Sequence, residues 1–91
     1  MKFLVLWSFN SFVRIGPEVA KTLMDLQDYA KQLKKSGKLD RYYHVVGKHG
    51  GAWIFDVTSN EELDRLIAMM PVYNFVNYEI FPLTEMGGDP T

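Results

Sequence analysis

In residues 2–9, apolar side chains occur at odd-numbered and at even-numbered positions. A strand over this run would carry Phe3, Val5, Trp7 and Phe9 on one side and Leu4 and Leu6 on the other. Apolar side chains on both sides indicate a sheet that is covered on both faces. The connection that follows, Asn10 to Gly16, is also unusually apolar, so we expect it to pack over a cavity or under a partner.

Helical spacing replaces this pattern between Pro17 and Ser36. Proline suits the first turn of a helix, and the Ser36-Gly37 pair is typical of a helix end. Apolar residues recur every three or four positions in between, at Val19, Leu23, Leu26, Ala30 and Leu33. The pattern predicts a helix with one buried stripe.

Two strands, a second helix and a last strand follow. Residues 39–46 alternate, with Tyr42, His44 and Val46 on one side and Arg41, Tyr43 and Val45 on the other. Residues 52–57 are typical of a buried strand. Ser59 and Glu62 fit a capping box that starts a helix, which Pro71 ends. Its inward residues would be Leu63, Leu66, Ile67 and Met70. Residues 77–83 form the fourth expected strand.

This order of elements is that of the α+β, ferredoxin-like βαββαβ fold, an antiparallel sheet with both helices on one face. We expect residues 1–91 to form one domain, with 84–91 as a flexible or partner-docking tail. Hydrophobic residues make up 47% of the chain, more than so small a core can hide. Two chains packing sheet against sheet would cover the bare face and could enclose a ligand cavity, which predicts a homodimer.

The turn before the third strand is rich in glycine. We expect Gly47, Gly50 and Gly51 to supply backbone conformations that other residues avoid, with Lys48 and His49 at the tip. A phosphate-binding loop would follow a strand and open a helix, whereas this turn precedes a strand. The turn therefore does not indicate a nucleotide site.

The composition argues against nucleic-acid-binding, thiol-dependent and membrane-spanning proteins. The net charge of −1 argues against a nucleic-acid partner, and the lysines at 31, 34, 35 and 38 complement the dipole of a helix end. The lack of cysteine excludes a thiol nucleophile and fits a reducing compartment. Residues 3–7 are too short an apolar run to span a membrane. We expect a cytoplasmic protein with a small-molecule substrate, without a membrane partner, and without a metal because the two histidines lack neighbouring ligands.

Several polar and aromatic side chains could carry chemistry in such a cavity. Moving a proton next to a carbonyl needs a base and a donor for the developing enolate. His44 and His49 are the candidate bases, Lys48 could bind a carboxylate and Tyr43 could donate to an oxyanion. Each of them also has a plain structural or surface explanation. The candidate binding residues are Tyr73, Arg14 at the cavity mouth, and Trp7, Trp53 and Phe55, which would line a wall or fill the core.

A set of motifs between residues 33 and 83 carries a resemblance. They are the Ser36-Gly37 stop, the Tyr42-Tyr43 pair, the GKHGG turn, the IFDV strand, the SNEEL helix start, the stretch Met70 to Phe75 and the closing Tyr78-Glu79-Ile80. Together they resemble the muconolactone isomerase family. The resemblance implies a dimeric α/β-barrel, often assembled into a ring of dimers, with a cofactor-free site between sheet and helices. It also implies a proton-shifting isomerisation of a small unsaturated lactone, or dehalogenation as in close relatives.

The resemblance also assigns individual positions. It implies that Lys48 is the polar residue of the glycine turn, with His49 at an aromatic position and Gly51 where asparagine is usual. The glutamate-lysine pair of the family's first helix aligns with Leu26 and Gln27. Asp28 is a nearby carboxylate and a candidate binding residue, although a neighbouring helical position points about 100° away.

The leading hypothesis is a small cofactor-free isomerase that shifts a proton on an unsaturated lactone or other enolisable cyclic compound. The alternatives are a related lyase or cyclase, or a non-catalytic binding or assembly module of the same fold, which Leu26 and Gly51 would suit. A haem- or quinone-directed monooxygenase is a further alternative. Turnover of an enol lactone would favour the isomerase, and a bound metabolite without chemical change would favour the module.

Overall fold

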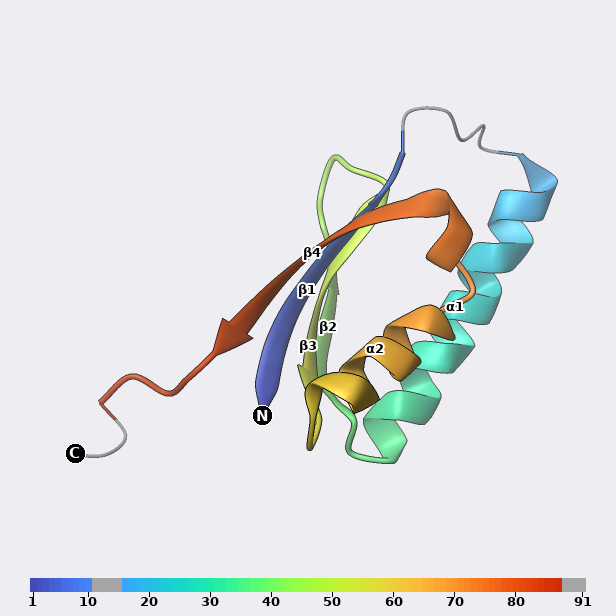
Figure 1. Cartoon of the computed structure of the whole chain (residues 1–91). Coiled ribbons are helices and arrows are strands. Elements are labelled where there is room, and N and C mark those ends of the chain that lie inside the picture. Colours follow the sequence, from blue (N-terminus) through green and yellow to red (C-terminus); the bar gives the residue numbers. More distant parts are fainter. Residues whose placement is uncertain (11–15, 88–91) are drawn as a thin grey trace.

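The structure is a computed structural model that describes residues 1–10 and 16–87 (Figure 1). Its elements are β1 (Lys2–Phe9), α1 (Pro17–Lys35), β2 (Leu39–His44), β3 (Gly50–Asp56), α2 (Asn60–Ala68), a short 3-10 helix (Tyr73–Phe75) and β4 (Val76–Leu83). This order confirms the predicted α+β, ferredoxin-like fold. In the described ranges, no helix is long and apolar enough to cross a membrane.

The strands of the described residues form one antiparallel sheet in the order β2-β3-β1-β4. Both helices lie against the same face of this sheet, as Figure 1 shows. The central strand β1 pairs with β3 from Lys2 opposite Asp56 to Ser8 opposite Gly50. Because directly paired residues share a face, this register decides which side chains meet beneath the helices.

The core lies between the sheet and the helices. From the sheet it takes the buried residues Phe3, Val5, Trp7, Trp53 and Phe55, which confirms the sides assigned to β1 by its alternation. From the helices it takes Val19, Leu26, Ala30 and Leu33 of α1 and Leu63 and Ile67 of α2. The Tyr29 hydroxyl donates a 2.6 Å hydrogen bond to the carbonyl of Leu66, which ties α1 to α2.

The start of α2 departs by one residue from the expected capping box. Ser59 Oγ accepts a hydrogen bond from the Glu62 amide at 3.0 Å, as predicted. The Glu62 carboxylate, however, accepts from the Thr58 amide at 2.9 Å, one residue before the cap, and from Lys38 Nζ at 2.8 Å. The hydrogen bond from Lys38, followed by that from Thr58, holds the pKa of Glu62 below its usual range. Glu62 thereby joins α2 to the segment that leads into β2.

The hairpin between β2 and β3 differs from the expectation in its boundaries and in the role of its glycines. β2 ends at His44 and β3 begins at Gly50, each two residues earlier than predicted. Gly47 has a positive φ of 83°, whereas Gly50 and Gly51 are strand residues without positive φ. A Cβ on Gly50 would overlap the backbone oxygen of Trp7 on β1, and a Cβ on Gly51 would overlap the Trp7 side chain. Gly50 therefore allows close approach of β1, Gly51 makes room for the indole, and neither serves a special backbone conformation.

The face of the sheet opposite the helices carries an apolar row. Leu4 of β1 lies opposite Ile54 of β3 and opposite Phe81 of β4. Leu4 and Ile54 are half-buried and Phe81 is 43% exposed. The described residues thus leave this row partly open to water, in agreement with the two-sided apolar pattern of the first strand.

Candidate functional site

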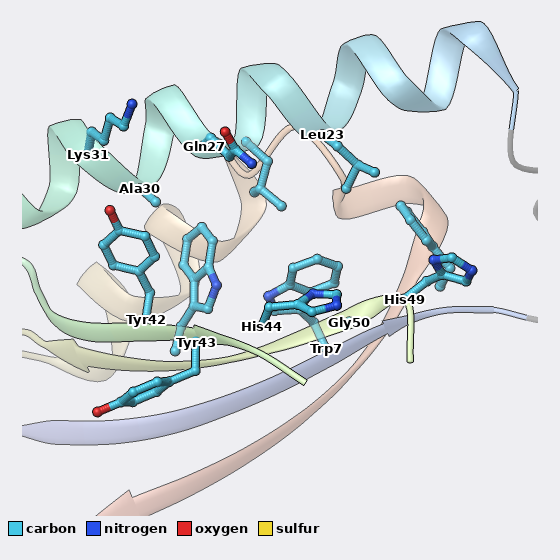
Figure 2. Close-up of a pocket in the computed structure, with 13 residues that line it drawn as sticks. Trp7, Leu23, Gln27, Ala30, Lys31, Tyr42, Tyr43, His44, His49 and Gly50 are labelled. Atoms are coloured by element: carbon cyan, nitrogen blue, oxygen red, sulfur yellow. The ribbon is translucent and has the colours of Figure 1, made fainter. Parts of the chain in front are cut away.

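A cavity of about 490 Å³ lies between α1 and the sheet (Figure 2). Its apolar lining consists of Trp7, Phe9 and Trp53 from the sheet and Leu23, Leu26 and Ala30 from α1. Its polar lining consists of Gln27 and Lys31 from α1, Tyr42, Tyr43 and His44 from β2, and His49 from the turn before β3. An apolar cavity with a few polar groups suits a small, largely apolar molecule that carries oxygen atoms.

The register of the sheet aligns three residues across neighbouring strands beneath α1. His44 of β2 lies opposite Gly51 of β3, and Gly51 lies opposite Trp7 of β1. Since directly paired residues share a face, all three positions face the helix. Gly51 has no side chain, so the space above it is left to its two neighbours.

The indole of Trp7 occupies part of that space. A Cβ on Gly51 would stand 2.6 Å from Trp7 Nε1 and 2.8 Å from Trp7 Cε2, closer than a real Cβ contact. Edge-to-face contacts with Phe9 and Trp53, at ring-centroid distances of 6.1 and 6.3 Å, hold the indole in place. Trp7 Nε1 is buried and has no hydrogen-bond partner in the part of the chain that the structure describes.

The cavity lining carries basic side chains and two tyrosine phenols. Among the described residues its lining contains Lys31 and two histidines, and no carboxylate. The described ranges also hold no group of three His, Cys, Asp or Glu side chains that could bind a metal ion. The imidazoles of His44 and His49 are therefore the lining groups suited to accept a proton near neutral pH.

The structure brings four of the sequence candidates together at this cavity: Trp7, His44, His49 and Trp53. Tyr43 also borders the cavity, but Figure 2 shows its ring on the opposite side of β2 from the ring of Tyr42. The alternation along a strand requires this arrangement. The Tyr43 phenol therefore points toward the open face of the sheet and away from α1.

Other candidates lie away from the cavity lining. Phe55 is fully buried in the core, and Lys48 is exposed in the turn beside the cavity. Asp28 is exposed on α1, one position beyond the lining residue Gln27. Arg14 lies outside the described residues. Packing thus places Phe55 in the core, and helix geometry turns Asp28 away from Gln27.

Tyr73 belongs to a separate aromatic group next to β4. Its ring packs against that of Tyr78 at a centroid distance of 5.9 Å, outside the cavity lining. Burial, followed by the charge of Tyr73, raises the pKa of the Tyr78 phenol well above its usual range. The Tyr78 hydroxyl accordingly stays protonated and donates to Met70 Sδ at 3.7 Å. This group packs the 3-10 helix and Met70, which follows α2, against the last strand.

Three polar lining residues are absent from the sequence candidates: Gln27, Lys31 and Tyr42. The sequence interpretation assigns Lys31 to a basic helix end, whereas the structure places it at the cavity. The sequence does contain a pattern that indicates this position of Lys31. Gln27 and Lys31 are one turn apart and directly follow Leu26 and Ala30 of the buried stripe. Polar residues that border an apolar stripe on successive turns lie at the edge of the buried helix face.

Comparisons with known proteins agree with this fold. The family model described as muconolactone delta-isomerase matches residues 1–88. Muconolactone delta-isomerase from Rhodococcus opacus is 35% identical over 76 residues, which cover 82% of each chain. The enzyme of that name from Cupriavidus pinatubonensis is 37% identical over 57 residues, 63% of this chain and 62% of the relative.

Two solved structures share the architecture. A crystal structure of muconolactone isomerase has a TM-score of 0.85 at 21% identity, over 98% of this chain and 94% of the other. A 5-chloro-2-hydroxyhydroquinone dehydrochlorinase from Burkholderia phenoliruptrix, in complex with 2,5-dihydroxybenzoquinone, has a TM-score of 0.78 at 14% identity, over 99% and 100%. At these identities the similarity establishes the fold alone. The family model spans nearly the whole sequence, and the chain therefore belongs to the muconolactone delta-isomerase family.

Proposed function

We propose that this chain is an isomerase that shifts a proton on a small unsaturated lactone bearing a carboxylate, with muconolactone as the first substrate to test. The family membership supports the reaction class. The cavity supports it independently, because apolar walls fit the lactone ring and Lys31 at the lining fits an anionic group. The observation that carries the proposal is the pair of imidazoles, His44 and His49, at an otherwise mostly apolar cavity.

The reaction requires one base and no co-reactant. In an α,β-unsaturated lactone, a base removes the proton on the γ carbon, and the electron pair delocalises through the double bond onto the carbonyl oxygen. The same proton, or one from water, then adds to the α carbon, and the double bond ends between the β and γ carbons. Atoms and electrons balance because one proton leaves and one returns. An imidazole is suited to both transfers because it gains and loses a proton near neutral pH.

We assign the proton transfer to His44. It lines the cavity from β2 and shares a row with Gly51 and Trp7 across the sheet. A small substrate in the cavity beside this row would therefore lie next to the imidazole. His49 belongs to the turn and lines the cavity from the loop, so it serves as the natural comparison.

The proposed active form is a homodimer, with a ring of dimers as a possible larger assembly. The support is the apolar row of Leu4, Ile54 and Phe81, which lies on the face of the sheet opposite both helices. A second copy packing its own sheet against this row would remove it from water. The Tyr43 phenol would then lie at the contact between the two copies.

Turnover of muconolactone by the purified protein, followed by ultraviolet absorbance, tests the proposal. We expect turnover by the wild type and a loss of about 100-fold or more in kcat with His44→Gln, as is usual when a general base is removed. His49→Gln is the matched control and should retain much more activity. No turnover by the wild type, or equal turnover by His44→Gln, would refute this assignment.

A further inference from the structure

The cavity wall contains a hydrogen-bond donor without a partner among residues 1–10 and 16–87. Trp7 is 7% exposed, and its Nε1 atom has no acceptor among the described residues. A buried N–H without a partner costs free energy, because it has lost its bond to water and gained none in return. The indole is held by edge-to-face contacts with Phe9 and Trp53, so it does not turn its nitrogen toward solvent.

The position of this donor is set by the absence of a side chain at Gly51. Trp7 Nε1 lies where a side chain of residue 51 would begin, 2.6 Å from the position of its Cβ. Gly51 is also the direct partner of His44 on the neighbouring strand. Neighbouring strands are about 4.8 Å apart, so the donor and the imidazole lie within reach of one small molecule. His44 is exposed at the end of β2, so its imidazole is open to a molecule that enters the cavity.

We infer that the Trp7 indole N–H donates a hydrogen bond to the lactone carbonyl oxygen of the substrate. This inference rests on the proposed function, in which negative charge develops on that oxygen as the γ proton leaves. A donor that is fixed before the reaction stabilises such charge without the cost of reorganisation. Gly51 serves this role by leaving room for the indole, which fixes the position of Nε1 beside the cavity. The substrate class is an acceptor-bearing lactone, held between the base His44 and the donor Trp7.

Nuclear magnetic resonance of the indole N–H groups tests this bond without turnover. The probe is the saturated lactone with the same acetate side chain, which cannot isomerise because it has no double bond. The chain has two tryptophans, so Trp7→Phe and Trp53→Phe assign the two indole signals. We expect the saturated lactone to move the Trp7 indole proton downfield and the Trp53 signal much less. A Trp7 signal that does not move, with or without other changes in the spectrum, would overturn the inference.

Kinetics supply the second readout. Trp7→Phe keeps an aromatic ring and removes the donor, and we expect about a 100-fold lower kcat with a small change in KM. Trp53→Phe is the matched control, because Trp53 is also buried at the cavity. Its kcat should fall much less than that of Trp7→Phe. Equal losses in both variants would mean that packing alone matters and would overturn the inference.

The two experiments separate this inference from the proposed reaction. If muconolactone is not isomerised but the saturated lactone still moves the Trp7 signal, the proposed reaction is wrong and the hydrogen bond from Trp7 is supported. If muconolactone is isomerised and the Trp7 signal does not move, the proposed reaction is supported and the hydrogen bond from Trp7 is wrong.

Discussion

Trp7 lies over Gly51, its partner on the neighbouring strand, so closely that a Cβ on residue 51 would stand 2.6 Å from the indole Nε1. The two residues therefore depend on each other. A tryptophan at position 7 fits because residue 51 lacks a side chain.

Adding a methyl group at residue 51 should destabilise the protein only while Trp7 is present. Gly51→Ala forces the indole out of its site, and we expect the free energy of unfolding to fall by about 2 kcal/mol. In a Trp7→Leu background the Cβ has room, so Gly51→Ala should lower the free energy of unfolding much less. Urea unfolding of the wild type, the two single variants and the double variant measures this coupling.

Gly47→Ala provides the control for that cycle. Gly47 has a φ of 83°, which an alanine adopts only with strain, and its cost does not involve the indole. We expect equal destabilisation by Gly47→Ala with Trp7 or Leu at position 7. Equal destabilisation by Gly51→Ala in both backgrounds would contradict the contact described above.

Lys31 should attract the carboxylate of the substrate. Replacing it by methionine keeps most of the apolar stem and removes the charge, and we expect KM to rise about 3-fold to 5-fold with little change in kcat. This corresponds to about 1 kcal/mol, the upper range for an exposed ion pair. The effect should shrink at high salt because salt screens exposed charges.

Lys35→Met is the matched control for Lys31→Met. Lys35 lies one turn further along α1, is exposed, and is not part of the cavity lining. Both changes alter the net charge equally, so a general electrostatic effect would raise KM in both variants. Only the loss of a contact at the cavity raises it in Lys31→Met alone.

Glu62 should make stability depend on pH in the acidic range. Its pKa is lower in the folded protein because it accepts hydrogen bonds from Lys38 and Thr58. The stabilisation is therefore complete above the unfolded pKa of about 4.3 and is lost as the pH falls through the lower, folded pKa. We expect Glu62→Gln to lower the melting temperature at pH 7 and to have a much smaller effect near pH 3.

The control for Glu62 is Glu61→Gln. Glu61 also lies in the first turn of α2 but is exposed. Its replacement should change the melting temperature little at either pH. If Glu62→Gln destabilised the protein equally at pH 7 and pH 3, the charged hydrogen bonds could not be the cause.

The apolar row on the open face of the sheet should hold two copies together. Ile54→Lys would place a charge at the centre of the proposed contact, and we expect sedimentation velocity at micromolar concentration to show the monomer. Met24→Lys adds the same charge on α1, where Met24 is 68% exposed, and should leave the dimer intact. A wild-type monomer at this concentration would contradict the proposed assembly.

The helices and the first strand could be predicted from sequence because their signals are local. The alternation of β1 and the proline and Ser-Gly signals that bound α1 give limits that match the structure, Lys2–Phe9 and Pro17–Lys35. The limits of the hairpin from His44 to Gly50 were harder to predict from sequence, because they depend on how closely β1 approaches β3. That approach is set by residues about 40 positions away in the chain, which no local pattern reports.

The site was predictable in part for the same reason. Histidines and tryptophans stand out by residue type, and those at 7, 44, 49 and 53 meet at the cavity. The row of His44, Gly51 and Trp7 joins three strands, so it follows only from the register of the sheet. The cavity position of Lys31 had a local signal in its spacing from Gln27, but its place among other lysines favoured a surface interpretation.

The position of the transferred proton tests the central claim most directly. Muconolactone would be incubated with the protein in D₂O and followed by proton nuclear magnetic resonance beside a protein-free sample. The account predicts loss of the γ proton signal, a double bond between the β and γ carbons, and a second hydrogen on the α carbon, which is protium where the same proton returns and deuterium where it has exchanged with the solvent. A spectrum that changes no faster than that of the protein-free sample would contradict the account.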